Sequence, residues 1–238
     1  MIYANIEWRG IDNNQPYSLN FNDVYFNSEH GLQETDAVFI AQNNLAARFA
    51  SLQKNQTFTI IETGFGSGLN FFAVASCWQQ YAPNDASLYY ISIEKYPLSI
   101  EDFTQCAQIW PAFSSFFHSI LPQYLHLKLG LNMLRGYTDD AESRILLALW
   151  ACPIDVALAS MTQKADAWLL DGFAPAKNAE MWSSEVFTHI ARLSQNGTTF
   201  ATFTSAGVVR RGLQAVGFNV KKQAGFGKKR EMLSGVFN

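Results

Sequence analysis

Residues 60–71 are Ile60-Ile61-Glu62-Thr63-Gly64-Phe65-Gly66-Ser67-Gly68-Leu69-Asn70-Phe71, in which three alternating glycines stand between two apolar runs. The run before the glycines is short and β-branched, as in a buried strand, and residues 69–75 after them have helical spacing. The glycines therefore fall on a strand-to-helix turn. Because glycine has no side chain, such a turn bends sharply and approaches a bound ligand closely. An ordinary glycine-rich turn is the alternative, and the motif alone does not decide between them.

The composition indicates a folded protein with one substantial core. The chain has 238 residues, of which 48% are hydrophobic, 14% aromatic and 16% charged. We therefore expect one domain, with room for a small appendage. No run approaches the roughly 20 apolar residues that cross a bilayer, and the first residues lack a signal pattern, so we expect no membrane association and a cytoplasmic location. Cys77, Cys106 and Cys152 are widely spaced, which argues against disulfides and against a thiolate zinc cluster.

Positive charge is concentrated near one end of the chain. Residues 205–238 hold seven basic side chains and one acidic side chain, although the whole chain has a net charge of −3. The seven are Arg210, Arg211, Lys221, Lys222, Lys228, Lys229 and Arg230. A local field of this sign attracts a polyanion such as a nucleic acid. A solvated surface that balances an acidic body is the alternative.

Strand patterns and helix patterns alternate along the chain. Residues 1–30 contain short alternating segments that predict a small β-rich extension. Strands are expected at residues 57–62, 88–93, 145–150, 165–170 and 198–203, with a last pair near 218–222 and 232–237. Helices are expected at residues 34–52, 69–81, 154–161, 183–193 and 208–216, and residues 99–136 are predicted to be mainly helical, with breaks before Pro111 and Pro122. This alternation predicts an open, doubly wound α/β sheet.

Polar residues follow three of the predicted strands. In a doubly wound sheet, ligands bind beyond the carboxyl ends of the strands, where the glycine turn, Glu94 and Asp171 are expected to meet. An acidic residue at the end of the second strand can accept hydrogen bonds from ribose hydroxyls, as nicotinamide cofactors and S-adenosylmethionine both require. The glycine spacing differs from the G-x-G-x-x-G of dinucleotide sites. The carboxylate of Glu62 would repel a pyrophosphate but tolerate a cationic sulfonium, which favours a methyl donor.

Several long motifs accompany the glycine turn. They are Asp23-Val-Tyr-Phe26, Gly31-Leu-Gln-Glu-Thr35, Glu94-Lys-Tyr-Pro-Leu98, Leu170-Asp-Gly-Phe-Ala-Pro-Ala-Lys-Asn178, Glu180-Met-Trp182, Ala201-Thr-Phe-Thr204, Val209-Arg-Arg-Gly-Leu213 and Gly225-Phe-Gly-Lys-Lys-Arg-Glu-Met232. Together with residues 62–71, these motifs resemble the methyltransferase part of the bifunctional tRNA-modifying MnmC family. The resemblance implies a class I S-adenosylmethionine-dependent methyltransferase, a Rossmann-like fold over residues 31–238, with the β-rich extension at residues 1–30. It implies that the cofactor S-adenosyl-L-methionine is bound by Glu62, Gly64, Gly66, Gly68, Asn70, Glu94, Asp155 and Asp171.

The resemblance also implies a reaction and partners. In this family, S-adenosylmethionine methylates the primary amine of 5-aminomethyl-2-thiouridine at the tRNA wobble position, giving 5-methylaminomethyl-2-thiouridine. The anticodon stem-loop of tRNA is therefore the expected partner. Family members occur alone or fused ahead of a flavin-dependent oxidoreductase domain. Because this chain has no second glycine-rich dinucleotide motif, flavin is not expected within it.

The chemistry of methyl transfer assigns roles to individual residues. An alkylamine has a pKa of about 10, so the substrate must lose a proton before its nitrogen attacks. We expect Asp171 to accept a hydrogen bond from this amine and orient its lone pair, and Phe173 to stack on the wobble base. Substrate contacts, mainly to phosphates, are expected from Lys177, Asn178, Arg210, Arg211, Lys228, Lys229 and Arg230. The four histidines lack ligand spacing, and no metal is expected.

One position departs from the family pattern. Where the family has a Gly-Asp pair after Leu-x-Leu-Trp, this chain continues from Trp150 with Ala151-Cys152-Pro153. Asp155 is the candidate replacement for the acid that faces adenine, and a backbone carbonyl is the alternative. Two other functions stay open at this point: a class I methyltransferase that acts on another amine, and a degenerate, noncatalytic tRNA-binding module.

Overall fold

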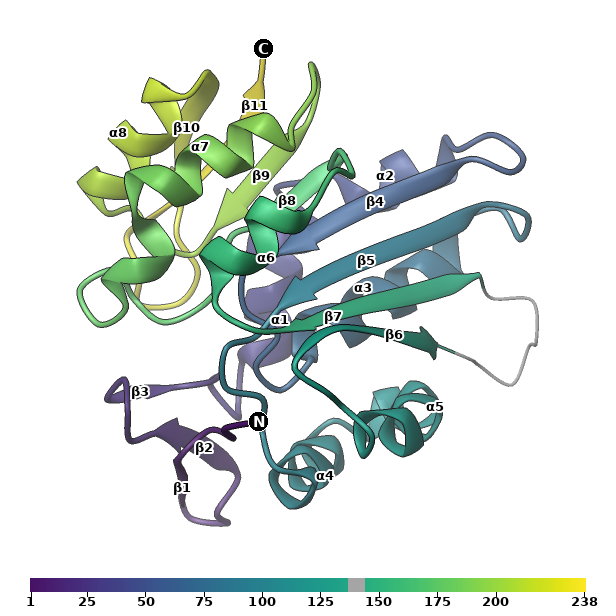
Figure 1. Cartoon of the computed structure of the whole chain (residues 1–238), viewed down its shortest axis with the longest axis vertical. Helices are drawn as coiled ribbons and strands as arrows, with labels where there is room; N and C mark the ends of the chain where they lie inside the picture. The colour runs from purple at the N-terminus through teal and green to yellow at the C-terminus, as the bar shows by residue number, and fades with distance from the viewer. Residues whose placement is uncertain (137–143) are drawn as a thin grey trace.

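The computed structural model describes residues 1–136 and 144–238, and its centre is one mixed β-sheet (Figure 1). The strands of this sheet are β4 (Thr57–Glu62), β5 (Ser87–Ile93), β6 (Gly130–Gly136), β7 (Ile145–Ala151), β8 (Ala167–Leu169), β9 (Thr199–Thr202), β10 (Phe218–Ala224) and β11 (Glu231–Phe237). Their order is β10-β11-β9-β8-β4-β5-β7-β6. The five strands from β9 to β7 are parallel, and β6, β10 and β11 pair antiparallel with their neighbours. The carboxyl ends of the parallel strands therefore share one edge.

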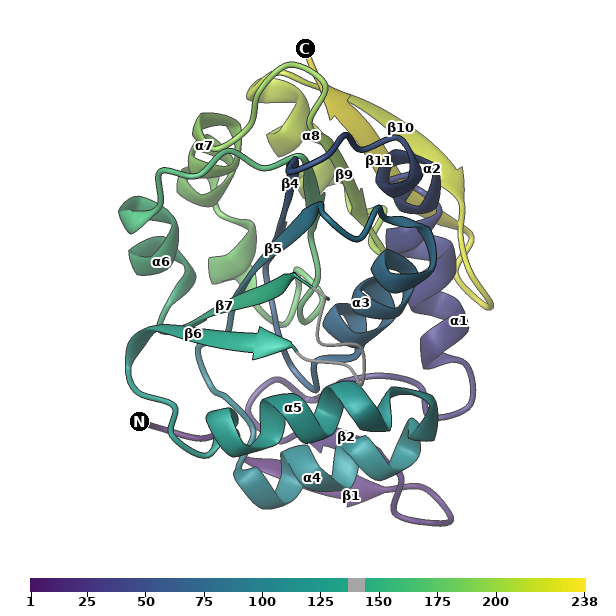
Figure 2. The ribbon, with the colours of Figure 1, turned by 90° about the vertical axis from the view of Figure 1, so that its right-hand side faces the viewer.

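Helices cover both faces of this sheet, as Figure 2 shows. One face carries α1 (Gly31–Thr35), the π-helical turn η1 (Asp36–Ile40), α2 (Leu45–Ala50), α3 (Leu69–Tyr81), α4 (Ile100–Ile109), the 3-10 turn η2 (Pro111–Phe113) and α5 (Ser114–Tyr124). The other face carries α6 (Ile154–Ser160), α7 (Ser184–Arg192) and α8 (Gly207–Ala215), and the 3-10 turn η3 (Ala179–Trp182) precedes α7. The predicted doubly wound α/β sheet is confirmed. In the part of the chain that the structure describes, no helix is long and apolar enough to cross a bilayer.

Each face of the sheet has its own apolar core. Phe71 and Phe103 belong to the core on the α3 side, whereas Trp168 and Leu213 belong to the core on the α7 side. Strand β4 contributes to both, because Ile60 and its neighbour Ile61 point to opposite faces. A central parallel strand is buried on both faces, which explains the continuous apolar sequence of β4. The glycine turn that follows β4 therefore lies in the middle of the carboxyl edge.

A small antiparallel sheet precedes the central one. Its strands are β1 (Ile6–Arg9), β2 (Gln15–Ser18) and β3 (Asp23–Val24), in that order. The indole nitrogen of Trp8 donates a 2.8 Å hydrogen bond to Asp102 in α4, and the Phe26 ring packs edge-on against Trp110. Figure 1 shows this sheet near the edge at which β4 and β5 end. The predicted β-rich N-terminal segment is confirmed, and the division of the chain at residue 30 stays a prediction.

Three local predictions are wrong. Residues 130–136 form the edge strand β6 rather than a helix, and its side chains alternate between exposed and more buried positions. The helix expected at residues 34–52 is interrupted at Asn44, which has a left-handed φ of 50° that asparagine tolerates. Pro122 lies inside α5 instead of ending a helix. Buried Phe117 and Ile120 hold α5 against the core although Pro122 removes one backbone hydrogen bond.

Candidate active site

The glycine turn between β4 and α3 brings two loops into backbone contact. Gly64 has a φ of 151°, and a side chain on it would lie 3.2 Å from the Cα atom of Gly172, in the loop after β8. Gly68 precedes α3 with a left-handed φ of 76°. Glycine is required at both places, for close approach at Gly64 and for the backbone conformation at Gly68. The loops that follow β4 and β8 are therefore in direct contact at the carboxyl edge of the sheet.

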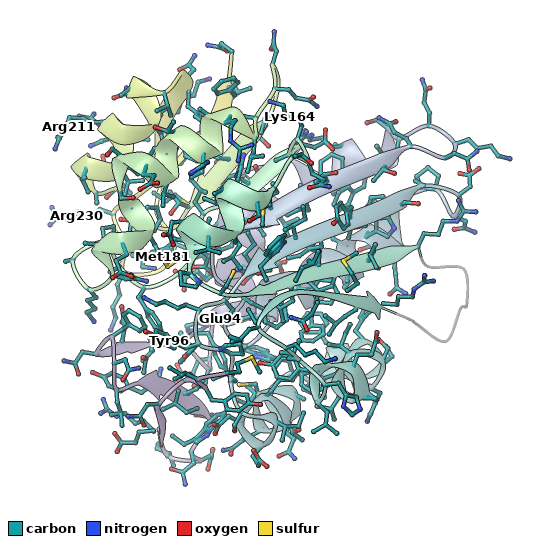
Figure 3. The ribbon with its side chains drawn as sticks, in the orientation of Figure 1. Glu94, Tyr96, Lys164, Met181, Arg211 and Arg230 are labelled. Carbon is teal, nitrogen blue, oxygen red and sulfur yellow. The ribbon has the colours of Figure 1, made fainter. Side chains whose placement is uncertain are left out.

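Glu94 follows β5 and holds the glycine turn. One carboxylate oxygen accepts a 2.9 Å hydrogen bond from the backbone N–H of Gly66, and the other accepts one of 3.0 Å from Tyr96. Burial raises the pKa of Glu94 to about 7, because desolvation disfavours the ion more strongly than the two N–H donors favour it. Figure 3 shows Glu94, Tyr96 and Met181 near the carboxyl end of β5. The predicted ribose acceptor thus lies against the glycine turn.

A hydrogen-bonded chain connects β4, α3 and the loop after β8. The side-chain nitrogen of Asn70 donates to Glu62 at 2.9 Å and to Asp171 at 2.6 Å. The second carboxylate oxygen of Glu62 accepts a 2.6 Å hydrogen bond from Ser92. Glu62 is fully buried, and this burial raises its pKa to about 8. Glu62 does not line either cavity described below, so it reaches the site only through Asn70.

Asp171 lies directly beyond β8 and faces a cavity. One of its oxygens accepts from Asn70, and the other accepts a 2.8 Å hydrogen bond from the backbone N–H of Gly172. Thr63 donates a 2.8 Å hydrogen bond to the backbone carbonyl of Asp171. Desolvation raises the pKa of Asp171 to about 6, which is still low enough for an anion at neutral pH. The sequence therefore places a fixed carboxylate at the edge of the sheet, beside the glycine turn.

Two cavities lie along this edge. The first has a volume of about 450 Å³, and its lining includes Tyr25, Glu34, Asn70, Asp171 and Lys229. The second has a volume of about 480 Å³, and its lining includes Pro153, Ile154, Asp155, Asn178 and Met181. Both cavities are lined by Gly64, Glu94, Gly172 and Phe173. Glu94 and the two glycines thus stand where the two cavities adjoin.

The N-terminal sheet covers Phe173. The Phe21 ring stacks on the Phe173 ring, with centroids 4.5 Å apart and an interplanar angle of 20°, and Tyr25 approaches it edge-on at 5.2 Å. The ammonium nitrogen of Lys177 lies 3.2 Å from a carboxylate oxygen of Asp23 in β3. One face of the predicted stacking platform is therefore covered by a ring from the N-terminal segment.

The predicted phosphate contacts fall into two groups. The ammonium nitrogen of Lys229 lies 2.6 Å from Glu34 and 4.4 Å from the centroid of the Phe203 ring, at the wall of the first cavity. Lys228 and Arg230 flank it in the exposed turn between β10 and β11. Arg210 is half-buried and Arg211 exposed on α8, and neither lines a cavity. Figure 3 shows Arg211 and Arg230 on the same side of the molecule.

Sequence reasoning missed several residues of the site. Phe21, Tyr25, Glu34, Thr35 and Met181 line the cavities without a predicted role. Four of them lie in motifs that carried the resemblance, residues 23–26, 31–35 and 180–182, so the motifs marked the segments but not their functions. Among residues 1–136 and 144–238, no group of three or more His, Cys, Asp or Glu side chains is arranged to hold a metal ion.

Comparison with known proteins decides the family. A family model described as S-adenosyl-L-methionine-dependent methyltransferase matches residues 111–238, which is more than half of the chain. The chain belongs to this methyltransferase family. Its cofactor is therefore S-adenosylmethionine, as the glycine turn and Glu94 predict. The carboxyl edge fits that group, since Glu94 can accept from a ribose and the apolar side chains of Ile154 and Met181 line the adjoining cavity.

Longer proteins contain regions similar to this methyltransferase. The "tRNA 5-methylaminomethyl-2-thiouridine biosynthesis bifunctional protein MnmC" of Marinomonas sp. is 47% identical over 94% of this chain and 32% of its own length. The protein of the same name from Methylobacillus flagellatus is 45% identical over 98% of the chain and 35% of its own length. The predicted resemblance to MnmC is confirmed. The chain spans about a third of the length of these relatives.

A solved structure has the same fold as this methyltransferase. MnmC2 from Aquifex aeolicus superposes with a TM-score of 0.71 and covers 99% of this chain and 71% of its own, with 18% sequence identity. At that identity the match shows the fold alone. The predicted class I methyltransferase fold is confirmed.

Proposed function

We propose that this chain is a tRNA methyltransferase that methylates the primary amine of 5-aminomethyl-2-thiouridine at the wobble position, giving 5-methylaminomethyl-2-thiouridine. The observation that carries this proposal is Asp171, whose carboxylate lines the first cavity and is held by Asn70 and Gly172 beside the glycine turn. The names of the relatives support this substrate. We further infer that a flavin-dependent oxidoreductase, fused or separate, supplies the aminomethyl group.

The residues that would hold the cofactor lie between the two cavities. Glu94 would accept hydrogen bonds from the ribose, and the adenine would lie in the second cavity beside Ile154 and Met181. Asp155 and the backbone after Pro153 are the candidate partners of the adenine amino group, in place of the Gly-Asp pair of the family. Gly64 and Gly66 would allow close approach of the methionine end, with Asn70 beside it and Glu62 behind, and Gly68, which lines neither cavity, would hold the backbone of the turn. When bound, the cofactor supplies an electrophilic methyl group on a sulfonium.

Asp171 is the group best placed to act on the amine. Its carboxylate would accept a hydrogen bond from an amine N–H and turn the nitrogen lone pair towards the methyl group. The nitrogen forms one bond to carbon, one carbon–sulfur bond breaks, and one proton is released to solvent. With a pKa of about 6, Asp171 is a weak base for an alkylammonium, so orientation is its larger contribution.

The first cavity would receive the wobble base. We place the base beside Phe173 and Tyr25, whose rings both line this cavity. Lys229 lines the cavity, and Lys228 and Arg230 flank it, which places basic side chains beside the cavity for the phosphates of the anticodon stem-loop. Lys177, Asn178, Arg210 and Arg211 are the remaining proposed contacts.

Nucleoside mass spectrometry tests the proposal directly. Hypomodified tRNA that bears the aminomethyl nucleoside is incubated with the protein and S-adenosylmethionine, and we expect the nucleoside to gain one methyl group. The same tRNA without the aminomethyl group is the control substrate and gains none. Cofactor binding without methylation of this tRNA would identify a methyltransferase for another amine. No cofactor binding would identify a noncatalytic tRNA-binding module.

A further inference from the structure

Thr35 is a buried polar residue at the end of α1 to which no role has been assigned. Its side chain is only 3% exposed, and its hydroxyl donates a 2.8 Å hydrogen bond to the side-chain oxygen of Asn70. Asn70 is the residue that contacts both Glu62 and Asp171. A residue of α1 is therefore two hydrogen bonds away from the carboxylate proposed to orient the substrate.

The Asn70 amide has one orientation that satisfies all of its neighbours. Its nitrogen carries two hydrogens, and these point to two carboxylates, Glu62 and Asp171, whose ionised forms accept but do not donate. A flipped amide would place its oxygen against the carboxylate of Asp171, which is ionised at neutral pH and has no hydrogen to donate. Thr35 supplies the donor that the oxygen requires in the observed orientation.

We propose that Thr35 and Asn70 are positioning residues for Asp171: Thr35 fixes the amide of Asn70, and Asn70 fixes the carboxylate of Asp171. The proposal rests on the proposed function, in which Asp171 orients the amine. Because Gly172 holds one oxygen of Asp171 and Asn70 holds the other, the carboxylate cannot rotate while both hydrogen bonds persist. Its remaining acceptor positions then point to a constant place in the first cavity.

Asp171 interacts electrostatically with several charged or titratable groups. They are Glu62 at the end of β4, Tyr90 within β5, Glu94 after β5, Glu34 in α1 and Lys229 in the turn between β10 and β11. The hydrogen bond from Asn70 favours the ionised form of Asp171 against the acidic neighbours. Weakening the hydrogen bond from Asn70 should therefore raise the pKa of Asp171, so that Asp171 ionises at a higher pH.

A conservative pair of substitutions at Thr35 tests this. Thr35→Val keeps the shape and removes the donor, and Thr35→Ser keeps the donor. The pKa of Asp171 is measured in protein with ¹³C-labelled aspartate carboxyls, and its signal is assigned by its loss in Asp171→Asn. We expect Thr35→Val to raise this pKa by roughly half a unit, and Thr35→Ser to leave it at the wild-type value. The pH at which kcat falls on acidification should also rise in Thr35→Val, and it should stay at the wild-type value in Thr35→Ser.

The outcomes separate this inference from the proposed function. An unchanged pKa of Asp171 in Thr35→Val, or an equal shift in Thr35→Ser, would overturn the positioning role, whatever the turnover. A shift confined to Thr35→Val, in a protein that does not methylate the aminomethyl tRNA, would leave the positioning network intact and defeat the proposed substrate. If Thr35→Val does not fold, Thr35→Ala is compared with Thr35→Ser by the same titration.

Discussion

The two cavities at the carboxyl edge are built from different kinds of segment. The second cavity is lined mainly by segments that follow parallel strands, such as Glu94 after β5 and Asp155 after β7, by η3 and by the start of α7, and Phe21 is its one lining residue from the N-terminal segment. The first cavity adds β3, α1 and Lys229 from the turn between β10 and β11, which lie far apart in the sequence. The parallel core thus supplies most of the side that we assign to the cofactor, and appended segments complete the side that we assign to tRNA.

The two cavities also differ in their basic side chains. The lining of the first cavity holds two lysines and four carboxylates, Asp23, Glu34, Glu94 and Asp171. Each lysine contacts a carboxylate from a distant segment: Lys177 contacts Asp23, and Lys229 contacts Glu34. The lining of the second cavity holds Glu94, Asp155, Glu180 and Glu185, with Lys95 as its basic member. Carboxylates thus outnumber lysines in both linings, which suits a cationic cofactor, and the basic side chains that suit a polyanion are Lys229 of the first cavity and its neighbours Lys228 and Arg230. Binding of the cofactor and binding of tRNA can therefore be weakened by different substitutions.

The largest effect is expected at Asp171. Asp171→Ala should lower kcat for methylation by roughly 10²-fold or more, because it removes the group that orients the amine. The dissociation constant of S-adenosylmethionine, measured by calorimetry, should stay within about twofold of wild type, since Glu94 and the glycine turn are unchanged. Asp171→Asn keeps the shape and tests the charge. A wild-type kcat in Asp171→Ala would exclude the proposed role.

The next largest effect concerns the basic turn between β10 and β11. The triple substitution Lys228→Ala, Lys229→Ala and Arg230→Ala should weaken tRNA binding at low salt by tenfold or more and lower the salt slope by about two. We count two contacts because Lys229 already contacts Glu34. Cofactor affinity should not change.

A matched control for this triple lies at the opposite edge of the sheet. Lys54, Arg144 and Lys164 precede β4, β7 and β8, respectively, so their joint replacement by Ala removes the same charge far from both cavities. Filter binding of tRNA across a salt series measures both triples. Equal slopes in the two triple variants would remove the basic turn from the interface.

The pH dependence of cofactor binding is expected to depend on Glu94. Its pKa is raised to about 7 in the free protein, and the ionised form accepts hydrogen bonds from a ribose and attracts a sulfonium. Affinity should therefore be complete above this pKa and be lost as pH falls through it, by about tenfold from pH 8 to pH 6. Glu94→Gln should bind more weakly at pH 8 and lose most of this dependence. Titration calorimetry at several pH values is the measurement, and an undiminished slope in Glu94→Gln would assign the dependence to another group.

The smallest effect is expected at the ion pair between Lys177 and Asp23. Both side chains are partly exposed, so a double-mutant cycle with Lys177→Ala and Asp23→Ala should give a coupling below about 1 kcal/mol in the free energy of unfolding. The N-terminal sheet keeps its other contacts, Trp8 with Asp102 and Phe21 with Phe173. Chemical denaturation at low and high salt measures the coupling. A larger, salt-independent value would show that this pair fastens the N-terminal sheet to the cavity.

Local patterns in the sequence predicted the parallel core well. The apolar run of β4, the glycines after it and the acids after β5 and β8 are short-range signals, and a parallel sheet brings their ends together by geometry alone. The strand at residues 130–136 was harder to predict, because only one side of an edge strand is paired and its apolar Leu131 and Met133 are exposed.

Long-range contacts at the site were beyond sequence reasoning. The stacking of Phe21 on Phe173 and the hydrogen bond from Thr35 to Asn70 join residues that no periodicity relates. The pKa of Glu62 was equally hidden, because complete burial, and not its neighbours in sequence, raises it. The sequence therefore predicts which segments meet at the site better than it predicts how their side chains pair.

The order of the last two strands has a consequence for synthesis on the ribosome. Strand β11 lies between β9 and β10, so β10 joins the sheet only through a strand that is translated after it. A nascent chain that has just completed β10 therefore exposes the free edge of β9, together with the side of Phe200 that later packs on Phe218. During that interval the turn that carries Lys228 and Arg230 has no fixed place beside the first cavity. Slow translation of residues 231–237 would prolong an aggregation-prone state that lacks the side that we assign to tRNA.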